Sequence, residues 1–371
     1  MNSLKQGKIM AILSAGVFFL SAGILPAQTP IDEARKIIEQ VDEVAGTYGR
    51  AQKDEGAKKP VIEKLEKAIS LLSEEKKKKN DDYDATFFLA RAYAMEYNLD
   101  IPGTLEKTVQ YSEEAIRLAP AKQEPCLFLA IFYTNSGHPS EAIEQYLKAL
   151  WLEGKKRNPI LLGGLAAAYS FAGNGLWAYC AAKQQLENFP QDPAAKAIFE
   201  MSKSLAGKNL IDSVEITFSP GGVIYKNKAL KYSFEIPPGW RVAREGRDGE
   251  NASMTEEVII LGLPKVKTEG GEEVENALGV MVFRKKDKKE ARTFAKNYLA
   301  DIKGKLEILE EGKDWLVFQS PSGEKVFKGR MEGITSGKFA YILNFTATKE
   351  TYDLNIGRFN KWKGNFKTNS K

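Results

Sequence analysis

The sequence predicts a multidomain chain in which an all-α helical-repeat array is followed by an α+β sandwich with a mainly antiparallel sheet. Two observations predict this fold class. In the first half of the chain, apolar and small residues recur at helical spacing in units that repeat after 36 residues. From about residue 213, short segments rich in β-branched and aromatic residues alternate with Gly, Pro and Asp turns. We therefore expect helical repeats over residues 31–207 and the sandwich over residues 213–371.

Each repeating unit reads as a pair of antiparallel helices. Small residues let two helices approach closely, while larger apolar residues fill the space around them. A glycine after the first helix supplies the left-handed residue that ends it. Each pair leaves an apolar flank that only the next pair covers, so such units come in arrays. One unit has Leu129, Ala130, Tyr133, Gly137 and Ala142, and the next has Leu165, Ala166, Tyr169, Gly173 and Ala178.

This pattern resembles the tetratricopeptide repeat, a helix-turn-helix unit of about 34 residues. The resemblance covers residues 31–207, with a degenerate first pair, an insertion in the turn after Tyr93, and a capping helix from Asp192. In that family the first helices line a concave groove that binds peptides or partner helices. Carried over position by position, the groove residues are Asp84, Phe87, Arg91, Met95, Glu124, Leu127, Ile131, Asn135, Ile160, Gly163, Ala167 and Phe171.

The composition of this groove indicates the kind of partner. Apolar and small residues dominate it, which favours an amphipathic helix or an extended segment of a protein partner. Family members that grip a C-terminal carboxylate use Lys, Arg and Asn there. Only Arg91 and Asn135 are of that type, so a carboxylate clamp is not expected. The alternative is that the N-terminal helices or the second domain fill the groove.

Residues 1–27 are predicted to be a signal peptide. Two lysines precede an uncharged apolar run over residues 9–25, and small residues follow, with cleavage expected after Ala27 or Gly23. The alternative is an uncleaved anchor helix, because the run approaches the roughly 20 apolar residues of a membrane span. We expect a periplasmic or secreted protein in the first case. In the second case the protein is anchored to the membrane by this segment alone.

The second domain shows several strands and two helices. In the predicted strand over residues 339–348, alternate apolar residues share one face, so that side of the sheet must be covered. Helices over about 288–305 and 351–366 each carry an apolar stripe that can cover it. One predicted strand ends at Ile236 and is followed by Pro237, Gly239 and Trp240. This motif, together with the order of elements, resembles the PsbP-like fold over residues 213–371. That family implies a non-enzymatic, protein-binding domain, sometimes with metal.

Catalytic residues, cofactors and metal are not expected. The only histidine, His138, stands between Gly137 and Pro139 and is predicted to occupy an exposed inter-helix turn. Cys126 and Cys180 are expected to be small buried apolar residues, and the alternative is a disulfide between them, which an exported chain permits. The second domain has no His or Cys, so metal binding by analogy has no histidine ligands. An acidic loop over residues 269–276 lacks the residue order of a calcium loop.

The formal net charge of +5 is too small for nucleic-acid binding. The sequence therefore favours an exported, non-enzymatic interaction scaffold whose repeat groove binds a cell-envelope partner of unknown identity. One alternative is an envelope assembly factor that holds many clients. A hydrolase in the second domain is disfavoured, since no nucleophile and base occur together there.

Overall fold

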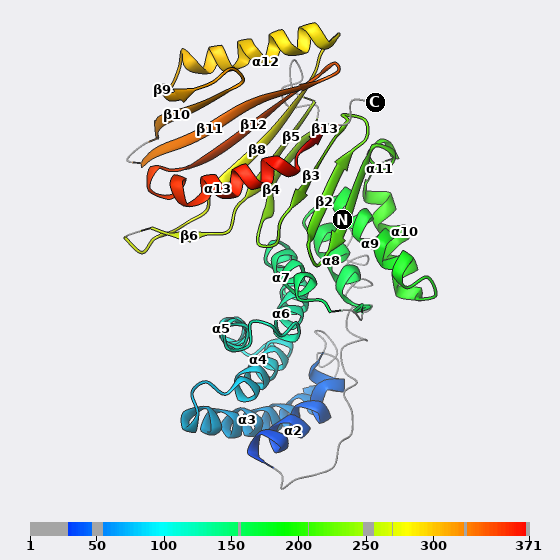
Figure 1. Cartoon of the computed structure of the whole chain (residues 1–371). Helices are drawn as coiled ribbons and strands as arrows, with labels where there is room; N and C mark the ends of the chain where they lie inside the picture. Colours follow the sequence, from blue (N-terminus) through cyan, green and yellow to red (C-terminus); the bar gives the residue numbers. More distant parts are fainter. Residues whose placement is uncertain are drawn as a thin grey trace. The chain divides into compact units, whose positions relative to one another are not determined.

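The computed structural model describes residues 29–46, 55–154, 157–206, 208–247, 256–268, 270–322 and 325–368 (Figure 1). The chain divides into two compact units, with the boundary between residues 207 and 208. The predicted signal segment lies outside the described residues. Among the described helices, none is both long and apolar enough to cross a membrane.

The first unit consists of helices that pack pairwise along the chain. The successive pairs are α2/α3, α4/α5, α6/α7 and α8/α9, and α10 packs on α9 as the predicted capping helix. The helices are α2 (Pro30–Ala45), α3 (Glu55–Lys78), α4 (Tyr83–Asn98), α5 (Thr104–Leu118), α6 (Glu124–Asn135), α7 (Pro139–Trp151), α8 (Leu161–Phe171), α9 (Gly175–Asn188) and α10 (Pro193–Ala206).

The repeat residues occupy the positions that the sequence predicts. The alanines at 130, 142, 166 and 178 are fully buried between helices. Gly137 and Gly173 have φ of 82° and 79°, the left-handed conformation that ends the first helix of each pair. The larger Tyr146 of α7 is also fully buried, and its ring lies against the backbone of α8 at Gly164.

The N-terminal pair is part of the same packing. A capping box starts α2: Thr29 accepts from the backbone N–H of Asp32, and the Asp32 carboxylate accepts from the backbone N–H of Thr29. Ile38 of α2, Leu65 of α3 and Met95 of α4 belong to one buried cluster. The degenerate first pair predicted from spacing is therefore a packed pair of helices.

Among its described residues, the second unit contains two principal sheets and three helices. One sheet has the order β1-β2-β3-β13 and the other β4-β5-β8-β12-β11-β10-β9, and all pairings are antiparallel. Two further short strands, β6 and β7, pair with each other. The helices are α11 (Lys208–Ser213), α12 (Lys288–Lys303) and α13 (Lys349–Asn365). The strands are β1 (Val214–Ser219), β2 (Gly222–Asn227), β3 (Tyr232–Ile236), β4 (Arg241–Arg247), β5 (Glu257–Gly262), β6 (Val266–Lys267), β7 (Glu273–Val274), β8 (Ala277–Arg284), β9 (Glu307–Glu311), β10 (Trp315–Ser322), β11 (Lys325–Ser336), β12 (Phe339–Thr348) and β13 (Lys367–Thr368).

Both faces of the seven-stranded sheet are covered around its central strand β12. On one face, α12 packs on Ala340 and Ile342 (Figure 1). On the other face, Phe345 contacts Phe359 of α13, and Tyr341 contacts Tyr232 of the four-stranded sheet. The face predicted to need covering is thus covered by α13 and by the smaller sheet. Helix α12, which was expected on that same face, packs on the opposite one. The opposite face is covered as well, so the unit is a layered α+β sandwich.

A buried carboxylate joins the two sheets. Glu257 of β5 is 1% exposed and accepts hydrogen bonds from the Tyr225 hydroxyl at 2.7 Å, the Asn227 amide at 3.0 Å and the Tyr232 hydroxyl. Buried carboxylates are tolerated when several donors satisfy their oxygens. These bonds hold the hairpin of β2 and β3 against the larger sheet. Trp240, the last residue of the motif that resembles the PsbP-like fold, is 5% exposed, and its ring stacks near that of Trp362.

Candidate functional site

The residues predicted to line the partner groove lie on the first helices α4, α6 and α8, and we call the surface they define the first-helix face. The structure buries part of this set and leaves part of it accessible. Binding by these residues stays a prediction. The buried members of the predicted set are Arg91, Met95, Leu127, Gly163 and Ala167; the partly or fully exposed members are Asp84, Phe87, Glu124, Ile131, Asn135, Ile160 and Phe171.

Helix α2 accounts for the burial on α4. Met95 belongs to the cluster formed with α2 and α3. Arg91 is 5% exposed, and its guanidinium lies 5.4 Å from the ring centre of Phe88. Burial lowers the pKa of Arg91 to about 10, while the carboxylates of Asp42 and Glu39 on α2 oppose that shift. Arg91 therefore faces the acidic side of α2 inside the array.

Helix α10 accounts for the burial on α8. Ala167 forms a small cluster with Phe171 and with Met201 of α10. A methyl group at Gly163 would lie 3.4 Å from Cδ1 of Ile198, also on α10. The capping helix thus covers this end of the first-helix face. The N-terminal helices, foreseen as a filler of the groove, cover part of α4. Helix α10, foreseen only as a capping helix, covers part of α8.

Helix α6 keeps the most accessible part of the first-helix face. Ile131 and Asn135 are half-buried and one helical turn apart, and Glu124 is exposed. The Oδ1 atom of Asn135 is enclosed, and no described residue donates a hydrogen bond to it. Phe87 of α4 reaches this region and packs edge-on against Phe128 at 5.7 Å between ring centres. Apolar surface and one unsatisfied acceptor therefore occur side by side on α6.

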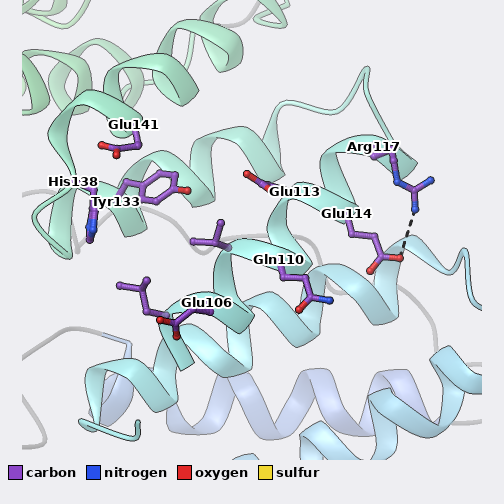
Figure 2. Close-up of a pocket in the computed structure, with 10 residues that line it drawn as sticks. Glu106, Gln110, Glu113, Glu114, Arg117, Tyr133, His138 and Glu141 are labelled. Carbon is purple, nitrogen blue, oxygen red and sulfur yellow. Dashed lines mark ion pairs between the residues drawn. The ribbon is translucent and has the colours of Figure 1, made fainter. Parts of the chain in front are cut away.

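A second recess lies along the second helix α5 and the start of α7 (Figure 2). Its volume is about 840 Å³. The floor includes apolar residues that pack on the core between α4 and α6, and the rim is mostly acidic. We call it the acidic groove; it is lined by Leu105, Glu106, Val109, Gln110, Glu113, Glu114, Arg117, Tyr133, His138 and Glu141.

Tyr133 lies at the centre of the acidic residues. Figure 2 shows its side chain between Glu141 of α7 and Glu113 of α5. Burial raises the pKa of Tyr133, and the charges of Glu113, Glu141 and Glu144 raise it further. The half-buried ring thus sits in a negative potential produced by carboxylates from two helices.

His138 lies in the inter-helix turn where it was predicted, but it borders the same groove and is half-buried rather than exposed. It occupies the position before α7, and its ring lies 5.9 Å from that of Tyr133. Its Nδ1 lies 3.2 Å from the Ser136 hydroxyl. The tertiary fold brings Glu113 of α5 to the groove that His138 borders, an approach that the local sequence does not show.

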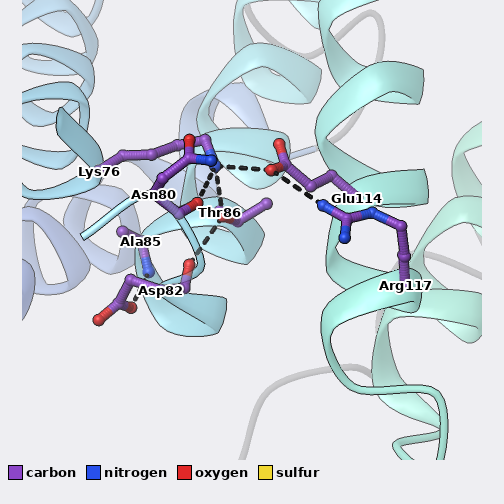
Figure 3. A network of polar contacts seen from close by, with 7 residues as sticks. All are labelled: Lys76, Asn80, Asp82, Ala85, Thr86, Glu114 and Arg117. Carbon is purple, nitrogen blue, oxygen red and sulfur yellow. Dashed lines mark hydrogen bonds and ion pairs between the residues drawn. The ribbon is translucent and has the colours of Figure 1, made fainter.

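A polar network fixes the wall of the acidic groove (Figure 3). The Lys76 ammonium of α3 donates to the Asn80 carbonyl at 2.8 Å, the Thr86 hydroxyl at 3.2 Å and the Glu114 carboxylate at 2.8 Å. Arg117 lies 3.6 Å from the same carboxylate. Glu114 is therefore compensated by two cations, and the network ties α3, α4 and α5 together.

No metal centre is evident in the part of the chain that the structure describes, where no group of three or more His, Cys, Asp or Glu side chains could hold an ion. Cys126 of α6 and Cys180 of α9 are both buried and are not joined in a disulfide. Burial raises the pKa of the Cys126 thiol, with Lys148 opposing the shift. This thiol is therefore disfavoured as a thiolate nucleophile.

The first unit and the second unit together define a helical-repeat protein with an antiparallel-sheet domain. No family model matches the chain, and no curated protein sequence matches it. Solved structures do match. A thermophilic TPR protein of Thermus thermophilus is 19% identical, with a TM-score of 0.33, over 47% of this chain and 97% of that one.

Two further solved structures resemble parts of the chain. Cyanobacterial PsbP from Synechocystis is 13% identical with a TM-score of 0.25, over 44% of this chain and 96% of that one. A protein of Bacteroides thetaiotaomicron is 14% identical with a TM-score of 0.24, over 38% of this chain and 45% of that one, so the match spans less than half of the Bacteroides protein. Helix pairs followed by an antiparallel-sheet domain are the architecture that the two resemblances predicted, and that prediction is confirmed.

Proposed function

We propose that the chain is a non-enzymatic, exported scaffold that binds a peptide or helix of a cell-envelope protein on its first-helix face. The observation that carries the proposal is the accessible part of α6, where Ile131 is half-buried and Glu124 is exposed. A bound segment supplies an apolar side chain that packs on Ile131 and removes the rest of its surface from water.

Both ends of the first-helix face are covered by other helices, which favours a short ligand. Helix α2 covers Met95, and helix α10 covers Ala167. The accessible surface therefore centres on α6 and on Phe87 of α4, which contacts Phe128. Arg91 is buried beside the carboxylates of α2, so the surface recognises apolar side chains and backbone rather than a terminal carboxylate.

Export is proposed from the first residues alone. Lys5 and Lys8 precede an apolar run that ends before Ala27. Mass spectrometry of the protein purified from its native cells will give the mature N-terminus. A terminus after Ala27 or Gly23 supports a cleaved signal peptide, and an intact N-terminus in the membrane fraction supports the anchored alternative. An intact N-terminus in the cytosolic fraction contradicts export.

Photo-crosslinking in intact cells tests the binding role. A photoreactive amino acid replaces Ile131, and a matched variant carries it at Lys183, which is exposed on the second helix α9. We expect one defined envelope protein to crosslink at position 131 and not at position 183. A broad set of clients at position 131 supports the client-holding alternative. Crosslinks only within the chain, or the same products from both positions, contradict the proposal.

A further inference from the structure

The acidic groove is a different surface from the first-helix face. Its walls come from α5 and the start of α7, the second helices of two successive pairs. It holds four carboxylates and one guanidinium. Although the whole chain carries a net charge of +5, this recess is therefore locally negative, and its chemistry differs from that of the surface around Ile131.

Three of the four carboxylates in the acidic groove have no cationic partner among the described residues. Glu114 is paired with Lys76 and Arg117. Glu106, Glu113 and Glu141 are exposed, and within the described chain none of them forms an ion pair. Water solvates exposed carboxylates well, so an ion pair with them contributes little binding energy, and charge alone does not select a ligand. The shape and composition of the floor supply the second requirement.

The floor is apolar and aromatic. Leu105, Val109 and Tyr133 are partly buried and pack on the core between α4 and α6. Lysine and arginine side chains combine an apolar stem with a cationic head, so a stem lies along Leu105 and Val109 while the head reaches Tyr133. The ring face attracts a cation, and Glu113 and Glu141 on either side strengthen that attraction.

We propose that the acidic groove is a second interaction surface, which binds a cationic amphipathic segment of a partner protein by taking a Lys or Arg side chain between Tyr133, Glu113 and Glu141. Charge complementarity and the apolar floor select this occupant. An acidic segment is repelled by the three uncompensated carboxylates. A purely apolar segment removes water from these carboxylates without supplying a cation or a hydrogen-bond donor, which is unfavourable. The Lys76 network holds α5 in place, so the groove is formed before the ligand arrives.

The test is a peptide titration with the full-length protein. The probe is a fluorescein-labelled peptide of sequence LKRLLKRLL, compared with the peptide in which every Lys and Arg is Glu. The test variant is Glu113→Gln with Glu141→Gln. The control is Glu187→Gln with Glu200→Gln, which removes the same charge from exposed positions on α9 and α10. Circular dichroism confirms that each variant is folded.

We expect the cationic probe to bind the wild type, with affinity falling about tenfold in the Glu113/Glu141 variant and about twofold or less in the control. Raising the salt concentration should weaken wild-type binding more than binding by the test variant. Equal losses in the two variants would show diffuse attraction and overturn the proposal. Equal binding of the acidic probe, or no binding of either, would also overturn it. None of these outcomes bears on crosslinking at Ile131, so the two proposals are tested separately.

Discussion

The contact between Gly164 and Tyr146 gives the sharpest test of how α7 packs on α8. A methyl group at Gly164 would come within 2.5 Å of Cε1 of the Tyr146 ring, and this ring is fully buried. At the adjacent Gly163, a methyl group would lie 3.4 Å from Ile198 and 3.9 Å from Gln185, which is ordinary contact. The two glycines are thus a matched pair on one helix.

Both Gly→Ala substitutions gain about 1 kcal/mol of helix propensity, and this gain cancels in the comparison. Overpacking a buried site costs about 1–3 kcal/mol. Gly164→Ala should therefore be less stable than Gly163→Ala by about 1–3 kcal/mol in the free energy of unfolding. For a unit of this size, 1 kcal/mol shifts the melting temperature by about 2–4 °C, so the two melts should differ by roughly 2–12 °C.

Thermal melts followed by circular dichroism at 222 nm measure this difference, since the helical unit dominates the signal. Gly163→Ala should match or exceed the wild type. If Gly164→Ala melts at the same temperature as Gly163→Ala or higher, the ring of Tyr146 does not lie against the backbone of α8. The close stacking of these helix pairs would then be wrong.

Three further outcomes are expected. Gly137→Ala should lower stability by about 1 kcal/mol because its φ is +82° while the space around it is open, and an unchanged melting temperature would contradict this. Tyr232→Phe removes a donor from the buried Glu257 carboxylate and should cost about 1–3 kcal/mol in urea unfolding; a loss near zero would show that the bond is dispensable. Burial raises the pKa of Glu96 above 4.5, so its charged form disfavours folding and this penalty grows as the pH rises above 4.5. Glu96→Gln should therefore raise the melting temperature at pH 7 relative to the wild type, with a smaller gain at pH 4, and an equal gain at both pH values would refute the cause.

Periodicity alone predicted the elements with strong alternation. The strands Tyr232–Ile236 and Phe339–Thr348 have the predicted bounds, because alternate aromatic and apolar residues run between clear turns. The strand Glu307–Glu311 was not predicted, because this edge strand is mostly acidic and exposed and is held by pairing with β10. Its tertiary partner, rather than its own sequence, makes it a strand.

For the candidate site, the sequence likewise indicated which residues share a helix side, but not which other helices cover them. Helical spacing identifies which residues share a side of α4 or α8, but it does not show what lies over that side. The burial of Met95 by α2 and of Ala167 by α10 appears only in the fold. The acidic groove was missed because Glu113 and Glu141 lie on helices from different pairs. The spacing of seven and eight residues between Glu106 and the pair Glu113 and Glu114, which places them on one side of α5, was the signal available in the sequence.

The most direct test of the scaffold proposal is the affinity of the full-length protein for the partner recovered by crosslinking at Ile131. Ile131→Ser removes the half-buried apolar side chain from the first-helix face, and Lys183→Ser changes an exposed residue of α9. The proposal predicts that Ile131→Ser weakens binding about tenfold while Lys183→Ser leaves it within about twofold of the wild type. Equal affinity for all three proteins would contradict binding at this face.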